Sequence, residues 1–336
     1  VAKILIVDDD PDMVEASRIV LERDGHSVAN ASNVDEGLER LAEVQPDLLI
    51  FHVYGAHDKY EDILRRTTSI GVSNFMPAHL ERLVGETGGK DFIFAHASSN
   101  PAEVATAITR GSFEYQGQKC SASSRCYLPK SLWPKIKEIL VKQVNDLKMG
   151  YPEDFTNFVN AVIDQSAFET ITAYVDYANK SKDCEVICGG KYDKAVGYFI
   201  EPTVVVTTDP HFKTMEEEIF GPVLTIYVYN DRRIEQTVGL VGSSSAYALT
   251  GSIFAEDREA IVELTRALRD AAGNFYINDK PTGAVVNQQP FGGSRASGTN
   301  DKAGSILNMI RWTSPRTLKE TFCPPKDYRY PFMSEE

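Results

Sequence analysis

The sequence lacks any apolar run of membrane-spanning length and any pair of cysteines in a CxxC spacing. The missing run excludes a transmembrane helix, and the N-terminus does not have the basic-then-apolar layout of a signal peptide, so we expect a soluble chain. The five cysteines are odd in number and cannot all pair within one chain. Their spacing fits no metal or redox motif, which favours reduced thiols from an intracellular compartment and predicts no metal site.

Basic residues are also in short supply, since 35 Lys and Arg stand against 48 Asp and Glu and the net charge is -13. A nucleic acid or an anionic membrane needs a basic face on its partner, and no basic cluster stands out. The chain has 336 residues, 42% of them hydrophobic, which is enough for a sizeable core in about two or three domains. We therefore expect a globular protein that acts on a small molecule and binds neither nucleic acid nor membrane.

Apolar runs alternate with segments of helical spacing over residues 1–55. The run "KILIVDDD" precedes a helical segment that ends near Gly25, and a second helical segment begins at Asn33, a residue that caps helices well. A buried third strand follows in "PDLLIFHVYG". Strands that alternate with helices form parallel, right-handed units, so the pattern predicts a partial doubly wound βαβαβ region.

This N-terminal region resembles the receiver domain of two-component response regulators. The resemblance implies a pair of acids that bind Mg²⁺ at the end of the first strand, and Asp8 and Asp9 match that pair. It also implies an aspartate that accepts phosphate, but His52 stands at that position, where no phosphoryl-aspartate can form. We therefore expect Asp8, Asp9 and Asp10 to be solvated acids at the end of a strand, and phosphorelay signalling is the alternative.

Residues 56–85 differ in character, because charge density rises before "SIGVSNF" predicts a strand and "PAHLERL" predicts a helix begun by proline. One more βα unit that extends the sheet accounts for this seam. The words "IGVSNFMPAHLERL" are similar to a segment of aldo-keto reductase barrels, a likeness too short to carry function. Three kinds of sequence meet within the first 85 residues, which favours a chimeric or engineered chain.

The stretch "EYQGQKCSASSRCYL" places Cys120 after a glycine turn and beside Lys119. A helix is predicted over 101–113, and the turn that leaves it exposes backbone N–H groups near the sulfur. Nearby donors and positive charge both favour the thiolate, which is the nucleophilic form. Glu86 lies earlier in "GETGGK", before two glycines that allow close backbone approach. The alternative for Cys120 is an inert, packed thiol, and for Lys119 a solvated turn charge.

Five blocks carry a more specific resemblance: "GETGGKDF", "FEYQGQKCSASSR", "MEEEIFGPVLTIYVY", "AAGNFYIND" and "QQPFGGSRASGTNDKAG". In order and spacing they resemble the signature blocks of the aldehyde dehydrogenase superfamily over about residues 83–332, and "GQKCSA" and "RWTSPRTLKETF" resemble its Δ1-pyrroline-5-carboxylate dehydrogenase branch. That branch oxidises L-glutamate γ-semialdehyde to glutamate with NAD⁺ in proline catabolism. The resemblance implies a three-layer α/β catalytic domain with a parallel sheet over 86–310.

The resemblance also implies roles for single residues. Cys120 matches the nucleophile that forms a thiohemiacetal and then a thioester, and Glu86 matches the general base that activates water. Partial burial of Glu86 should raise the pKa of its carboxyl toward working pH. Glu218 and Phe220 match the residues that hold the ribose and the ring of the nicotinamide. The backbone N–H of Cys120 would donate to the developing oxyanion.

For the remote carboxylate of the substrate, the resemblance implies contacts from Lys119, Ser121 and an anchor loop that contains Gly283 and Ala284. Phe291 would pack on the aliphatic chain. Ala284 departs from the family pattern, in which a serine is common. One hydrogen bond to a charged acceptor would be missing, which is worth roughly 1.5–3 kcal/mol.

The N-terminal half of the family, with most of its dinucleotide-binding fold and an oxyanion asparagine, has no recognisable counterpart before residue 83, and no GxGxxG occurs in residues 1–82. A catalytically incompetent fragment is therefore the alternative to an active NAD-dependent enzyme. The family further implies a C-terminal strand within 311–336 that joins a partner subunit in a homodimer or larger oligomer. Relatives work in the mitochondrial matrix, and a cytoplasmic location is the alternative.

Overall fold

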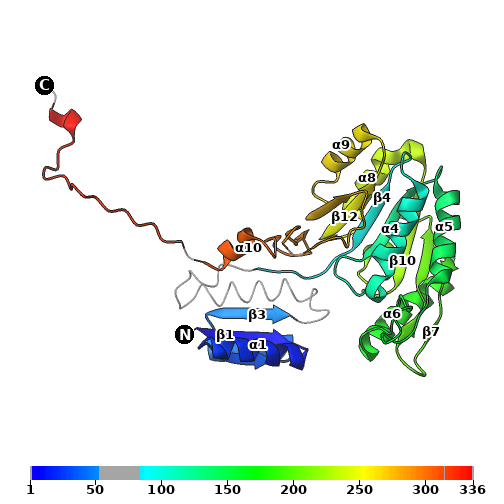
Figure 1. The fold of residues 1–336 in the computed structure, drawn as a ribbon, viewed down its shortest axis with the longest axis horizontal. Coiled ribbons are helices and arrows are strands. Elements are labelled where there is room, and N and C mark those ends of the chain that lie inside the picture. The colour runs from blue at the N-terminus through cyan, green and yellow to red at the C-terminus, as the bar shows by residue number, and fades with distance from the viewer. Residues whose placement is uncertain (1, 53–83, 286, 314, 335–336) are drawn as a thin grey trace.

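The computed structural model describes residues 2–52, 84–285, 287–313 and 315–334. The strand and helix predicted between residues 69 and 83 lie outside these ranges. Figure 1 shows the course of the chain, with a small N-terminal unit in blue, a larger α/β unit from cyan to yellow, and a C-terminal segment in orange and red.

The N-terminal unit confirms the predicted βαβαβ pattern. Its elements are β1 (Lys3–Asp8), α1 (Pro11–Arg23), β2 (Ser27–Ala31), α2 (Val34–Val44) and β3 (Leu48–His52), and the strands lie parallel in the order β2-β1-β3. The side chain of Asn33 caps α2 by accepting a hydrogen bond from the Glu36 amide, as its residue type predicts. The prediction of a buried third strand is wrong, because Leu49 and Ile50 of β3 are half-buried.

The strand-end acids of this unit are not simply solvated. Asp10 caps α1, since its side chain accepts hydrogen bonds from the amides of Asp12 and Met13. Asp8 is buried, and its Oδ1 accepts a hydrogen bond from the Asp10 amide at 2.9 Å. Local helix capping therefore explains part of the acidic run without any metal ion.

The larger unit is built on a seven-stranded sheet in the order β13-β12-β4-β5-β10-β9-β6. Its strands run parallel except β6, which is antiparallel to β9. They are β4 (Asp91–Ala95), β5 (Ser123–Pro129), β6 (Cys184–Cys188), β9 (Thr203–Thr207), β10 (Val223–Tyr229), β12 (Thr250–Phe254) and β13 (Asn274–Ile277). Two-residue strands form separate pairs, β7 (Tyr192–Asp193) with β8 (Phe199–Ile200) and β11 (Tyr247–Ala248) with β14 (Ser294–Arg295).

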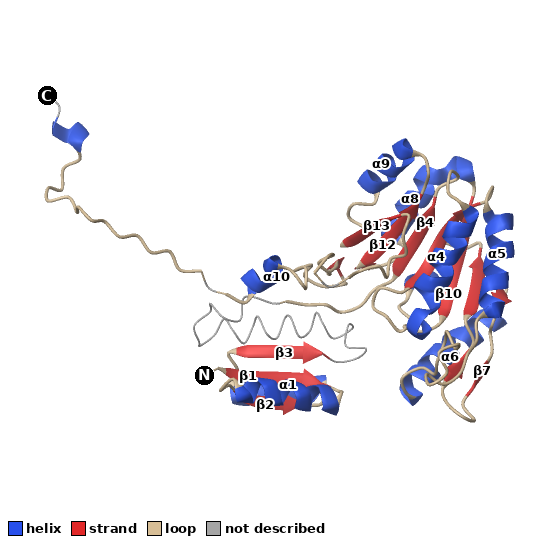
Figure 2. Ribbon diagram, in the orientation of Figure 1, coloured by secondary structure: helices blue, strands red, loops and turns tan. Residues whose placement is uncertain are grey.

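Helices cover both faces of this sheet, which gives the predicted three layers (Figure 2). Apolar residues of α4 (Pro101–Phe113) and α5 (Trp133–Asp146) pack on one face, and those of α6 (Gln165–Lys180), α8 (Ile234–Ser243) and α9 (Arg258–Ala267) pack on the other. The short helices are η1 (Glu114–Gly117), α7 (Lys213–Glu216) and η2 (Asp231–Arg233). Because both faces are covered, the strands are apolar on both sides.

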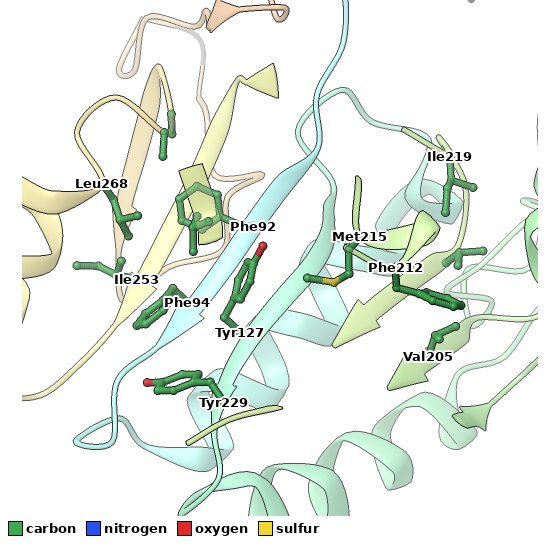
Figure 3. Packing of buried hydrophobic residues seen from close by; sticks show 14 of the residues in the cluster. Phe92, Phe94, Tyr127, Val205, Phe212, Met215, Ile219, Tyr229, Ile253 and Leu268 are labelled. Atoms are coloured by element: carbon green, nitrogen blue, oxygen red, sulfur yellow. The ribbon is translucent and has the colours of Figure 1, made fainter. Parts of the chain in front are cut away.

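Strand β4 shows how alternation fills two cores. Phe92 and Phe94 belong to one apolar cluster and Ile93 to the other, and all three are fully buried. The ring of Phe94 stacks between Tyr127, with centroids 6.3 Å apart, and Tyr229, at 5.3 Å (Figure 3). This aromatic stack fixes β4, β5 and β10 against one another. The starts of the same three strands carry the candidate site.

The C-terminal segment holds α10 (Ile306–Arg311) and η3 (Pro331–Ser334). In Figure 1 the chain between them extends away from both units. No strand forms among the described residues 315–334, so the predicted C-terminal strand is not part of any sheet within this chain. Within the described residues, no helix combines the length and apolarity that crossing a membrane requires.

Candidate active site

Three segments that hold the predicted chemistry enter the sheet at the same edge. Glu86 comes just before β4, Cys120 just before β5, and Glu218 just before β10. These strands are neighbours and run parallel. Parallel strands begin at a common edge of the sheet, so residues far apart in sequence converge there.

The turn that carries Cys120 has an unusual backbone. After α4 ends, Tyr115, Gln116 and Gly117 all have positive φ values of 57°, 51° and 66°. Only glycine adopts this region without cost, and a Cβ at Gly117 would lie 2.4 Å from the carbonyl oxygen of Gly221. The predicted glycine turn is therefore present, and it packs tightly against the segment that leads into β10. Residues 114–120, which lead from α4 to Cys120, are called the nucleophile turn below.

Cys120 itself is half-buried, and the amide of Ser121 hydrogen-bonds to its sulfur. The pKa of its thiol is raised to about 12, first by burial and then by the negative charges of Glu86 and Asp91. The prediction that the thiolate is favoured is wrong, because burial and the nearby carboxylates outweigh the amide donor. The effect of Glu86 places its carboxylate within electrostatic range of the sulfur, as the shared site requires.

Lys119 does not act as the predicted cation beside the sulfur. Its Nζ lies 3.1 Å from Oε2 of Glu114, so the ammonium is paired with a carboxylate. The same Oε2 accepts a hydrogen bond from Nζ of Lys280 at 2.8 Å. Sequence inspection missed this contact, which joins residues 166 positions apart. Only the folded chain brings them together.

Glu86 is exposed, so the predicted partial burial is wrong. Its backbone forms an antiparallel bridge with Gly298, whose φ of 127° and close approach to Gly85 exclude a side chain there. Gly85 also donates a hydrogen bond from its amide to Oγ1 of Thr299 at 2.8 Å. The glycine-rich loop near residue 298 thus fixes the backbone of Glu86 and leaves its side chain at the surface.

Glu218 and Phe220 line one pocket together with Lys119, Gly89 and Gly117. Oε1 of Glu218 accepts a hydrogen bond from the Gly89 amide at 2.7 Å. This bond links the segment before β10 to the segment before β4. A carboxylate offers acceptors for sugar hydroxyls and an aromatic ring offers an apolar surface for a flat ring, so the chemistry of these two side chains suits a nicotinamide ribose. Neither Cys120 nor Glu86 is among the residues that line this pocket.

The predicted substrate residues lie in two places. Ser121 is buried beside Cys120, while Gly283 and Ala284 follow β13 in a loop where Ala284 is exposed. That loop contacts the nucleophile turn through Lys280, whose Nζ also donates to Oγ1 of Thr282 at 2.8 Å. Phe291 is half-buried and pairs its backbone with Ala303. No observed contact joins Phe291 to the other four, so its role stays a prediction.

Two buried charged residues at this edge were also missed. Lys90 and Asp91 are each 1% exposed. Burial raises the pKa of Asp91 to about 8, although its Oδ1 accepts a hydrogen bond from the Thr250 amide at 2.6 Å. Burial, followed by the charge of Arg125, lowers the pKa of Lys90 to about 7. Their adjacency in "GGKDF" is visible in the sequence, but their burial is not.

Across the residues that the structure describes, no three His, Cys, Asp or Glu side chains are grouped so that they could hold a metal ion. The family comparison gives the decisive observation. Residues 66–317 match the model of the aldehyde dehydrogenase family. The chain belongs to the aldehyde dehydrogenase family. The match begins earlier than the expected residue 83, so the segment that resembles aldo-keto reductases lies within it.

Curated relatives and solved structures of this family narrow the likeness. The chain is 55% identical over 282 residues to the mitochondrial Δ1-pyrroline-5-carboxylate dehydrogenase of Dictyostelium discoideum, covering 84% of this chain and 50% of the relative. It is 52% identical over 253 residues to that of Bos taurus, covering 75% of this chain and 45% of the relative. The chain thus spans about half the length of the curated relatives it matches.

A crystal structure of the Δ-pyrroline-5-carboxylate dehydrogenase from Mycobacterium tuberculosis is similar in fold, with a TM-score of 0.81 at 38% identity. The likeness covers 99% of this chain and 66% of that one. The same protein bound with NAD gives a TM-score of 0.78 with the same coverage. Because nearly the whole chain is covered, the N-terminal βαβαβ unit is included in the likeness. The receiver resemblance and the chimeric origin stay predictions.

Proposed function

We propose that this aldehyde dehydrogenase chain oxidises an aldehyde to a carboxylate with NAD⁺, and that its substrate is L-glutamate γ-semialdehyde. The observation that carries the proposal is the convergence of Cys120 and Glu86 at the starts of neighbouring strands, where the Glu86 carboxylate contributes to the raised pKa of the thiol. The pocket that Glu218 and Phe220 line opens at the same edge. A nucleophile, a base and a place for a nicotinamide are the parts this chemistry needs.

In the first step, the thiol of Cys120 must lose its proton. With the thiol pKa raised to about 12, sulfur attacks the aldehyde carbon only as its proton leaves for solvent. A carbon–sulfur bond forms, and the oxygen becomes the oxyanion of a thiohemiacetal, beside backbone N–H groups such as that of Cys120. When bound, NAD⁺ supplies the acceptor for the hydride that this carbon loses.

The second step releases the product from the thioester that remains on Cys120. Glu86 takes a proton from water, and the resulting hydroxide attacks the acyl carbon. The carbon–sulfur bond breaks, and the carboxylate leaves as the thiol is restored. An exposed Glu86 suits this role because its side chain lies at the surface, where water reaches it, while the bridge to Gly298 fixes its backbone.

An acidic substrate is supported by the loops around the thiol and by the names of the relatives. Ser121 is next to the nucleophile, and the loop with Gly283 and Ala284 is tied to the nucleophile turn through Lys280. Lys119 and Lys280 bring two positive charges to this region, and Glu114 brings one negative charge that is shared between them. Opposite charge favours a carboxylate on the remote end of the aldehyde. Phe291 would pack along its aliphatic chain.

We also propose a homo-oligomer and a mitochondrial location. The segment at 315–334 is extended and exposes large apolar side chains, and pairing with a partner's sheet would cover both. Its exposed apolar residues include Leu318, Phe322, Tyr328 and Tyr330. Curated relatives are described as mitochondrial. A catalytically incompetent fragment is the second candidate, favoured by the raised pKa of the Cys120 thiol, which keeps the nucleophile protonated at neutral pH.

The test measures NADH absorbance after the chain is mixed with NAD⁺ and glutamate γ-semialdehyde, together with NAD⁺ binding by calorimetry. Activity that disappears in Cys120→Ser and in Glu86→Gln supports the proposal. NAD⁺ binding without turnover, or alkylation of Cys120 without NADH formation, identifies the incompetent fragment. Acetyl phosphate followed by intact-mass analysis examines the receiver alternative, for which an adduct on residues 1–55 is the expected sign.

A further inference from the structure

A charged bridge joins the nucleophile turn to the anchor loop. Glu114 follows α4 directly, Lys119 precedes Cys120, and Lys280 stands at the start of the loop with Thr282. One oxygen of Glu114 accepts hydrogen bonds from both ammonium groups, at 3.1 Å and 2.8 Å. The side chains are 22–32% exposed, so the cluster is sheltered without being sealed.

Lys280 is the more firmly fixed of the two lysines in this bridge, because its ammonium group makes two hydrogen bonds. Its Nζ lies 2.8 Å from Oγ1 of Thr282 as well as from Glu114, so the ammonium ties its own loop to the end of α4. Burial raises the pKa of Glu114, but the hydrogen bonds from Lys280 and Lys119 outweigh it and hold that pKa below its usual range. Glu114 is therefore charged at neutral pH and binds both cations.

Without Glu114, two ammonium groups would share this place with no carboxylate between them. Like charges at such short range repel, and long lysine side chains relieve the repulsion by turning to solvent. The ion-pair link between the turn with Cys120 and the loop with Gly283 would then be lost.

We infer that Glu114 is a positioning residue that sets the spacing between the Cys120 sulfur and the anchor loop, and thereby selects aldehydes with a carboxylate at a matching distance. The inference rests on the proposed function, since it needs an acidic substrate. Glu114 does not touch the reacting atoms. It acts through Lys119 and Lys280.

The experiment uses two α-bromoketones, bromolevulinate and its amide, which differ only in the charge of the remote group. Alkylation rates at Cys120 are followed by peptide mass spectrometry in the full chain, and the exposed Cys323 serves as a reference thiol in the same molecule. The variants are Glu114→Ala, Glu114→Gln and Lys280→Met. Glu138→Ala is the matched control, because it removes an exposed pair with Lys135 on α5.

We expect the acid to label Cys120 faster than the amide in the parent chain, and Glu114→Ala to reduce this preference by roughly three- to fivefold, the range that one charge pair supports. Lys280→Met should reduce the preference for the acid to a similar extent, and Glu114→Gln should reduce it less. Glu138→Ala should leave the preference unchanged. A purely structural role would slow both reagents equally. An unchanged or increased preference in both Glu114→Ala and Lys280→Met overturns the inference. No preference in the parent chain overturns the acidic-substrate proposal and this inference with it.

Discussion

Replacement of Gly117 by alanine tests how the nucleophile turn is built. Gly117 has a φ of 66°, and an added Cβ would meet the carbonyl oxygen of Gly221 at 2.4 Å and that of Ser112 at 2.8 Å. The left-handed conformation alone costs alanine about 1 kcal/mol. Both neighbours are backbone atoms, so relief of the overlap requires backbone movement and adds about 1–3 kcal/mol.

Gly304→Ala is the matched control for this substitution. Gly304 has a φ of 79° but no atom within 4 Å of the position of an added Cβ. It should therefore show the conformational cost alone, about 1 kcal/mol. The difference in unfolding free energy between the two variants therefore measures the contact between the nucleophile turn and the segment before β10.

Urea unfolding followed by tryptophan fluorescence measures both variants, because Trp133 begins α5 and packs on the buried core. Gly117→Ala should be less stable than Gly304→Ala by about 1–3 kcal/mol. Alkylation of Cys120 should also slow in Gly117→Ala, since the turn must shift. Equal stability of the two variants would refute the claim that this turn is tightly packed.

Three further predictions follow from single contacts. Asp91→Asn should speed alkylation of Cys120 above pH 8 but not below, because the pKa of Asp91 is raised to about 8 and its charge exists only above that value; the pH profile checks this. Ala284→Ser should lower the KM for an acidic aldehyde about tenfold or more without affecting a neutral one, through one added hydrogen bond. Phe94→Ala should destabilise the chain by about 3–5 kcal/mol in urea titration, because it empties the stack between Tyr127 and Tyr229.

Local signals in the sequence predicted much of the fold. Helical spacing and a suitable first residue located α4 at 101–113 and the start of α2 after Asn33. The alternation of apolar runs and helices over residues 1–55 predicted parallel strands, which the order β2-β1-β3 confirms. The parallel sheet that holds β4, β5 and β10 was implied by the resemblance to aldehyde dehydrogenases. These features depend on residues close together in the chain, and their physical causes are therefore visible in the letters.

Properties of the site that depend on distant residues were not predictable in this way. The pKa of the Cys120 thiol is raised by burial and by the carboxylates of Glu86 and Asp91, which lie before and at the start of β4. No pattern in the sequence around Cys120 indicates either effect. The exposure of Glu86 is set by the loop around Gly298, and the partner of Lys119 involves Lys280 from beyond β13. Local sequence reports which residue types are present, whereas their charge state follows from the folded neighbours.

The pH dependence of Cys120 alkylation by iodoacetamide, compared between the parent chain and Glu86→Gln, tests the central claim most directly. A carboxylate near the sulfur raises the thiol pKa, so its removal lowers that pKa and increases the thiolate fraction at every pH below it. We predict faster alkylation at pH 9 in Glu86→Gln, with the exposed Cys323 unchanged. Identical profiles at Cys120 in the two proteins would contradict a shared site for the thiol and Glu86.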